Sequence, residues 1–132
     1  MSFAVSTESR LTTVDVTDRI AAAVPDGLEE GICTAFVQHT TAGLVVQEAE
    51  PRLRDDLESF LRDVVPDEGH AHDELDGNAD SHLRASLVGP DVTIPVADGE
   101  LALGTWQSVL LVECDGPRTR TVSVTTVGES RP

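Results

Sequence analysis

Lysine is absent from this chain of 132 residues, and aromatic residues make up only 3% of it. Nine arginines stand against 24 acidic residues, which gives a formal net charge of −15 at pH 7. Such a surface repels nucleic acids and anionic membranes, and we exclude both as partners. The acidic residues are scattered along the chain and form no tail. This distribution indicates a surface adapted to high salt, where screening removes the self-repulsion, and it predicts a halophilic source.

Long hydrophobic runs and cysteine motifs are also missing. No stretch approaches the roughly 18 apolar residues that span a bilayer. The first 15 residues include Glu8 and Arg10 and do not resemble a signal peptide, so we expect a cytoplasmic protein. Cys33 and Cys114 lie in separate apolar runs, a placement more typical of buried thiols than of a disulfide.

The length suits one domain, residues 1–132, and its patterns predict two main helices. The first begins near residue 15 and is ended by Pro25 and Gly27. The second covers residues 50–64, with a proline in its first turn and a stripe of leucine, phenylalanine and valine on one face. A short helical turn is expected at 82–87.

Strands account for most of the remaining chain. Residues 2–14 look extended, and Asp115-Gly116 predicts a hairpin between the last two strands. Further strands are predicted over 31–39, 42–48, 92–95, 100–102, 106–114 and 119–128. Helices embedded among six or seven strands predict an α+β fold.

A histidine ends one of the buried strands. His39 is followed by Thr40, Thr41 and Gly43. Hydroxyls and free backbone N–H groups in a tight turn can cradle an oxyanion or a phosphate, with the imidazole as acid, base or ligand. The alternative is a histidine at the edge of the core that bonds a backbone carbonyl.

Carboxylates and a carboxamide provide further candidates. Glu48 ends the second buried strand and Asp56 lies on the flank of the 50–64 helix, and each is either a site residue or a solvated charge. Gln107 shares a predicted strand face with apolar residues and Glu113. Because such groups are costly when buried without partners, this face indicates a subunit interface or a wet pocket.

The polar segment at 67–82 contains the other three histidines, His70, His72 and His82. Segments of this length without periodicity are usually functional or disordered. Together with His39, these residues can assemble a three-histidine site of the kind that suits zinc or another divalent metal. The His-x-His spacing by itself is a weak metal signal.

Four motifs carry a resemblance to a known family. They are HTTAG, QEAEPRLRDDL, HDELDGNADSHLRASLVG and the segment that begins TIPVADGELALGTWQ, at residues 39–43, 47–57, 72–89 and 93–129. Together they resemble the YjbQ family, also called the secondary thiamine-phosphate synthase family. Two positions depart from its pattern. Gln47 stands where asparagine is usual, and Arg84 stands where lysine is common, which keeps the charge but not the point-like ammonium.

The resemblance implies a single YjbQ-like α+β domain with a sandwich-like sheet core, assembled as a homotrimer with pockets near the subunit boundaries. It implies a weak thiamine-phosphate synthase activity, which joins a pyrimidine pyrophosphate to a thiazole phosphate. The polar residues that match the family are His39, Thr40, Glu48, Asp56, His72, His82, Ser86 and Gln107. From these and their neighbours we predict His39, Asp56, Glu48 and Gln107 as catalytic residues. We predict Thr40, Thr41, Ser86 and Arg84 for substrate binding, and His39, His72 and His82 for a zinc or magnesium ion.

Two hypotheses follow. In the first, the protein is a transferase, and a cation or arginine neutralises the departing diphosphate. In the second, a homotrimer binds a metal or a small anion without turnover, since no nucleophile motif, Walker loop or dinucleotide fingerprint is present. In both, the expected ligand is a small phosphorylated metabolite.

Overall fold

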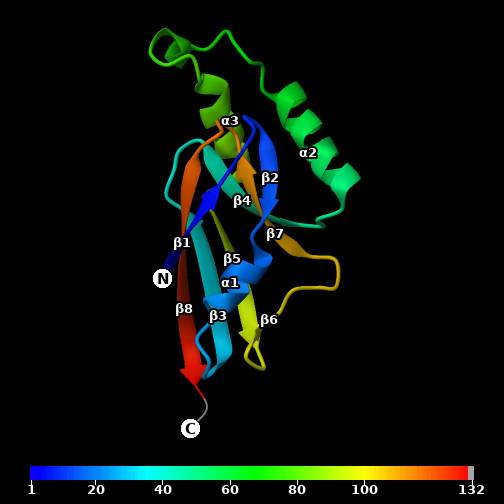
Figure 1. Cartoon of the computed structure of the whole chain (residues 1–132), viewed down its shortest axis with the longest axis vertical. Helices are drawn as coiled ribbons and strands as arrows, with labels where there is room; N and C mark the ends of the chain where they lie inside the picture. Colours follow the sequence, from blue (N-terminus) through cyan, green and yellow to red (C-terminus); the bar gives the residue numbers. More distant parts are fainter. Residues whose placement is uncertain (131–132) are drawn as a thin grey trace.

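Each strand of residues 1–130, the part of the chain that a computed structural model describes, belongs to one of two antiparallel sheets (Figure 1). The larger sheet has the strand order β1-β8-β3-β5-β6 and the smaller one β2-β7-β4. The strands are β1 (Ser2–Ser6), β2 (Thr12–Asp15), β3 (Leu28–Val37), β4 (Ala42–Gln47), β5 (Asp91–Ala97), β6 (Glu100–Leu101), β7 (Ser108–Glu113) and β8 (Thr119–Ser130). With the helices described below, they confirm the predicted α+β class.

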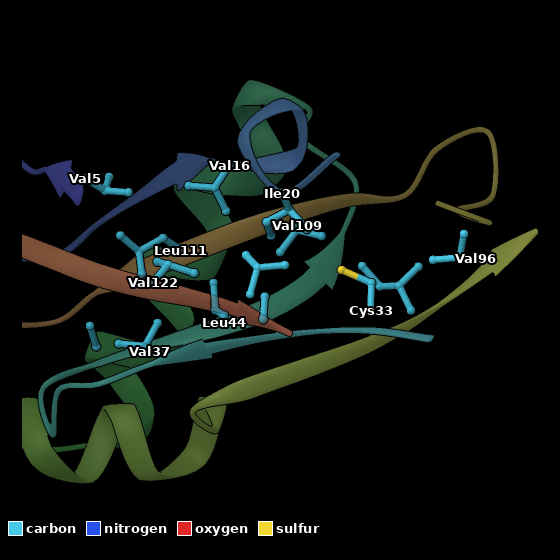
Figure 2. Close-up of a cluster of buried hydrophobic side chains, with 14 of the residues drawn as sticks. Val5, Val16, Ile20, Cys33, Val37, Leu44, Val96, Val109, Leu111 and Val122 are labelled. Atoms are coloured by element: carbon cyan, nitrogen blue, oxygen red, sulfur yellow. The ribbon is translucent and has the colours of Figure 1, made fainter. Parts of the chain in front are cut away.

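The core lies between the two sheets (Figure 2). Cys33 and Val122 come from the larger sheet, Leu44 and Leu111 from the smaller one, and all four are at most 1% exposed. Ile20 of helix α1 (Thr17–Ala22) completes this cluster. Each such side chain contributes about 1.5–3 kcal/mol when it leaves water. Helix α1 is shorter than predicted, because the chain turns within its last residues towards β3.

Three further helical segments lie at one end of the sheets, shown at the top of Figure 1. They are α2 (Pro51–Val64), the 3₁₀ turn η1 (Ala71–Glu74) and α3 (Ala79–Val88). Helix α2 begins as predicted, with Pro51 in its first turn and the Glu50 side chain accepting a hydrogen bond from the Leu53 amide at 2.7 Å. Helix α3 is longer than the turn predicted at 82–87, so the two main helices are α2 and α3.

The predicted hairpin at Asp115-Gly116 is wrong. Strand β7 pairs with β2 and β4 in the smaller sheet, whereas β8 pairs with β1 and β3 in the larger one. The connection packs against the β1–β2 segment, where a Cβ on Gly116 would lie 2.2 Å from the carbonyl oxygen of Ser9. Glycine is therefore needed here for a close approach of two backbones and not for a hairpin turn.

Both cysteines are free and buried, as predicted. Within residues 1–130, no helix combines the length and the apolar character that crossing a bilayer requires.

Candidate functional site

An open depression of about 970 Å³ lies where β3 ends, β4 begins and α3 passes. Residues 36–42 form one wall, and α3 contributes His82 and Ser86. Arg118 and Arg120, at the start of β8, also line it, together with Asp115. We call this feature the His39 depression.

The His39 ring continues the hydrogen-bond ladder of the larger sheet beyond the end of β3. The carbonyl of Thr121 accepts a bond from the Gln38 amide at 3.3 Å. The amide of Thr121 then donates to Nε2 of His39 at 2.9 Å. The ring nitrogen thus takes the place of the backbone carbonyl that would accept this bond in a regular ladder. Burial lowers the pKa of His39, and the positive charges of Arg120 and Arg118 lower it further, against the opposing effect of Glu113. The ring is therefore neutral at pH 7.

A buried ion pair lies beneath the depression. Glu113 of β7 is 0% exposed and Arg120 of β8 is 2% exposed, and their side chains pair across the two sheets. Arg120 also donates to the carbonyl and hydroxyl oxygens of Thr41 at 3.1 and 2.8 Å, and Thr7 donates to Glu113 at 2.6 Å. Burial opposes ionisation of Glu113, but the hydrogen bonds from Arg120 and Thr7 outweigh it and lower the pKa.

One nitrogen of this pair remains available to a ligand. Nε and Nη2 of Arg120 hold Glu113 and Thr41. Nη1 has no hydrogen-bond partner in the part of the chain that the structure describes. On the rim, Arg118 donates to Asp115 at 2.9 Å, and Asn78 donates to the same carboxylate at 3.1 Å. These bonds lower the pKa of Asp115 against the effect of its burial.

Five of the residues predicted for the site line this depression. They are His39, Thr40, Thr41, His82 and Ser86. The hydroxyl of Ser86 donates to the backbone carbonyl of His82 at 2.8 Å, so its oxygen can still accept a hydrogen bond. The hydroxyl of Thr41 accepts from Arg120 and retains its own proton to donate.

Glu48 and Gln107 lie at the other end of the smaller sheet. Glu48 follows β4, whose six residues separate it from the depression by roughly 20 Å. Gln107 precedes β7, and its exposed side chain accepts a bond from the Gly104 amide at 2.8 Å, which closes the 104–107 loop. Asp56 is exposed on α2 and does not line the depression. Glu113, which indicated an interface or a wet pocket, is instead paired inside the fold.

Arg84, predicted to bind substrate, is occupied elsewhere. The side chain is 1% exposed, and its guanidinium donates to the carbonyls of Leu61 and Val65 at 3.0 and 2.8 Å. It also pairs with Asp80 at 2.6 Å and with Asp67 at 2.8 Å. Because each of its three nitrogens is engaged and the side chain is 1% exposed, Arg84 joins the end of α2 to α3 and is not presented to a phosphate. The prediction is corrected accordingly.

The predicted three-histidine metal site does not form. The rings of His72 and His82 meet edge to face with centroids 4.9 Å apart, and Nε2 of His72 lies 3.5 Å from Asp76. His70 bonds the Pro66 carbonyl at 2.8 Å. Nε2 of His39 is held by the Thr121 amide. Across residues 1–130, no three His, Cys, Asp or Glu side chains are grouped to hold one ion. A zinc or magnesium ion therefore does not fit the residues that the sequence indicated.

Sequence reasoning missed Arg118, Arg120 and Asp115. A signal for Arg120 was present, since it shares the inward face of β8 with Val122 and Val124. An inward arginine requires a buried carboxylate, and Glu113 on its predicted strand face is a carboxylate that requires a partner.

Comparison with known sequences identifies the family. The sequence pattern of the UPF0047 protein YjbQ-like family matches residues 1–129. The chain belongs to this family. A UPF0047 protein of Archaeoglobus fulgidus is 43% identical over 125 residues, which cover 94% of this chain and 98% of the relative. The UPF0047 protein YugU of Bacillus subtilis is 33% identical over 126 residues, which cover 94% of this chain and 96% of the relative.

Solved structures of YjbQ-like proteins have the same fold. A YbjQ-like protein of unknown function from Sulfolobus solfataricus superposes with a TM-score of 0.95 at 37% identity, covering 98% of this chain and 96% of the other. A hypothetical protein from Aeropyrum pernix gives a TM-score of 0.93 at 43% identity, with 98% of each chain covered. The family is thus shown by both sequence and fold, and these two proteins carry no described activity in their names.

Proposed function

We propose that the His39 depression binds the phosphate group of a small phosphorylated metabolite. The observation that carries this proposal is the grouping of donors around one depression. Arg118 and Arg120 provide positive charge, Thr40 and Thr41 provide hydroxyls, and His39 provides a ring nitrogen. Phosphate oxygens accept hydrogen bonds from such donors, and guanidinium groups match their geometry.

A transferase reaction at this site is the activity that the family resemblance implies. In thiamine-phosphate synthesis, the ring nitrogen of the thiazole phosphate uses its lone pair to form a C–N bond to the methylene carbon of the pyrimidine pyrophosphate. The C–O bond breaks and its electron pair leaves with pyrophosphate, so no proton must move. The protein then has to position two substrates and neutralise the departing charge, which is a role for Arg118 and Arg120.

The first experiment measures binding. Isothermal titration of inorganic phosphate and of pyrophosphate in high-salt buffer should give saturable binding that the Arg118→Ala substitution weakens by about tenfold. Arg118 is an exposed residue, and so is Arg52, which pairs with Glu50 far from the depression. Arg52→Ala is therefore the matched control. Equal binding by wild type and Arg118→Ala, or no binding of either anion, would overturn the proposal.

The second experiment separates catalysis from binding. The protein is incubated with the pyrimidine pyrophosphate and the thiazole phosphate, and thiamine phosphate is quantified by chromatography. Product that disappears in His82→Ala supports the transferase. If phosphate binds but no product forms, the protein is instead a binding protein without turnover. That alternative is favoured by one observation: Arg120 is already paired with Glu113 and Thr41, so only part of its charge is left to neutralise a departing diphosphate.

We also propose that the protein assembles as a homotrimer through the outer face of the larger sheet. Eight of the nine outward positions in the middle of this face carry no charge, with Asp91 as the exception, although a quarter of the chain is charged. They are Ile32, Thr34, Phe36, Thr93, Pro95, Ser123, Thr125 and Val127. Copies with a net charge of −15 repel each other, so this neutral face is where two copies can approach at the lowest electrostatic cost. The number of three comes from the family resemblance.

Light scattering in high salt tests the assembly. Ile32→Asp should reduce the trimer mass to that of a monomer. Leu83→Asp is the control, because Leu83 on α3 is similarly exposed at 43%, against 46% for Ile32, and lies outside the sheet face. A monomeric wild type would contradict the proposal.

A further inference from the structure

We infer that His39 acts in the depression as a neutral hydrogen-bond donor through Nδ1, held in that tautomer by the backbone of β8, and that it donates to an oxygen of an anionic ligand. This inference deepens the proposed phosphate site and rests on it. It assigns His39 a role different from metal ligation and from general base catalysis.

The tautomer follows from one contact. The Thr121 amide can only donate, so Nε2 of His39 at 2.9 Å must be the nitrogen without a proton. A neutral imidazole with a bare Nε2 carries its proton on Nδ1. Rotation of the ring by half a turn would place a carbon, Cε1, against the amide and leave that donor unsatisfied. The amide lies in the middle of the larger sheet, between β1 and β3, and cannot turn away.

The same contact rules out two other roles. A histidine that binds a metal through Nδ1 protonates its other nitrogen. Here that proton would point at the Thr121 N–H, so metal binding would break the strand contact. A general base needs a free lone pair facing the ligand, and the lone pair of this ring is already used on Nε2. Protonation of His39 would likewise set two donors against each other.

The surroundings of the ring indicate the charge of its ligand. Nδ1 has no hydrogen-bond partner within residues 1–130, while the ring lines the depression. Arg118 and Arg120 line the same depression, and their positive charges help burial to lower the pKa of His39, against the opposing effect of Glu113. Two carboxylates also line the depression. Asp115 is held by Arg118 and Asn78, and Asp76 lies beside His72. An anionic oxygen at Nδ1 therefore meets donors from the two arginines, and one of the two carboxylates, Asp115, is already paired.

Two substitutions separate the donor role from the strand contact. The amide of asparagine is attached to Cγ, as Nδ1 is, so His39→Asn can place an N–H near the donor position but cannot reach the Thr121 amide. The longer glutamine places its carboxamide near Nε2, so His39→Gln can accept from Thr121 but offers nothing at Nδ1. Phosphate affinity should fall in the order wild type, Asn, Gln. Thermal stability should fall in the order wild type, Gln, Asn.

The expected size of the effect is a loss of phosphate affinity of at least about tenfold in His39→Gln, as one hydrogen bond to a charged group is removed. A purely structural His39 predicts the reverse, with glutamine retaining both stability and binding. Equal phosphate affinity of wild type and His39→Gln would therefore overturn the inference.

The tautomer itself is measured on the free protein. Long-range ¹H–¹⁵N spectra of the four imidazoles resolve which nitrogen of each ring is protonated, and His39→Gln assigns the His39 signals. We expect a proton on Nδ1 and a bare Nε2 at pH 7, and a shift of the Nδ1 signal on titration with inorganic phosphate. A proton on Nε2, or a cationic ring at pH 7, would refute the inference even if phosphate binds. Absence of phosphate binding with Nδ1 protonated would instead refute the proposed phosphate site, and the ligand part of the inference with it.

Discussion

Replacement of Arg84 should destabilise the fold more than replacement of any exposed arginine. Arg84→Met keeps most of the aliphatic volume and removes the guanidinium that joins α2 to α3. Asp80, which is 0% exposed, then loses its 2.6 Å partner, and the carbonyls of Leu61 and Val65 lose the arginine as a donor, although the Val65 amide still donates to Leu61. Removal of one partner of a buried ion pair costs about 3–5 kcal/mol.

The remaining contacts place the expected loss near the lower end of that range. Asp80 still receives two hydrogen bonds from Arg10, both at 2.9 Å, so its charge is not left uncompensated. The two carbonyls end α2 and can be reached by water once the arginine is gone, which lowers the penalty for each below its fully buried value of about 1–3 kcal/mol. We expect Arg84→Met to reduce the free energy of unfolding by about 3 kcal/mol.

Urea denaturation followed by far-UV circular dichroism measures this free energy. Arg52→Met is the matched control, because Arg52 also pairs with a carboxylate at 2.7 Å but its side chain is 92% exposed. Exposed ion pairs contribute about 0–1 kcal/mol. If Arg84→Met and Arg52→Met lose the same free energy of unfolding, the assignment of Arg84 as a structural residue is refuted.

Three further predictions concern salt, pH and thiol reactivity. The midpoint of thermal unfolding should rise steeply between about 0.1 and 2 M KCl, because screening reduces the self-repulsion of a chain with a net charge of −15. Equal stability at both salt concentrations would contradict the prediction of a halophilic source. Folding lowers the pKa of His39, so the unfolded chain takes up this proton first and stability should decline as pH falls below about 6.5. His39→Gln should make the free energy of unfolding, measured by urea titration at several pH values, depend less on pH. An unchanged pH dependence in this variant would contradict the assignment of the decline to His39. Burial raises the pKa of Cys114 to about 12, so a thiol reagent at pH 8 should label it only on unfolding, and rapid labelling of the native protein would show that it is accessible.

The strands and α2 were predictable because their side chains follow simple periods. The apolar run that ends at His39 and the break at Thr40 and Thr41 correctly located the end of β3 and one wall of the depression. Helix α3 was underestimated because its buried face is largely polar. It carries Asp80, Ser81 and Arg84 inward, and a search for apolar periodicity does not detect such a helix.

The site was only partly predictable for a related reason. Strand-end positions of His39 and its threonines can be read from a local pattern. The separation of Glu48 and Gln107 from the depression depends on which end of the smaller sheet each strand terminus occupies, and no local pattern contains that information. The failed hairpin prediction has the same origin, because turn residues describe a turn but not the sheets that receive the flanking strands.

The Glu113–Arg120 pair also bears on how the protein folds. These residues are seven positions apart, yet they belong to different sheets, so their contact closes a short loop. The entropy lost in closing a loop grows with its length, which makes this one of the least demanding ways to bring the two sheets together. Other contacts between the sheets, such as Thr7 with Glu113, span more than a hundred residues. The β7–β8 connection is thus suited to form early in folding, and the floor of the depression would be assembled before much of the larger sheet has closed around it.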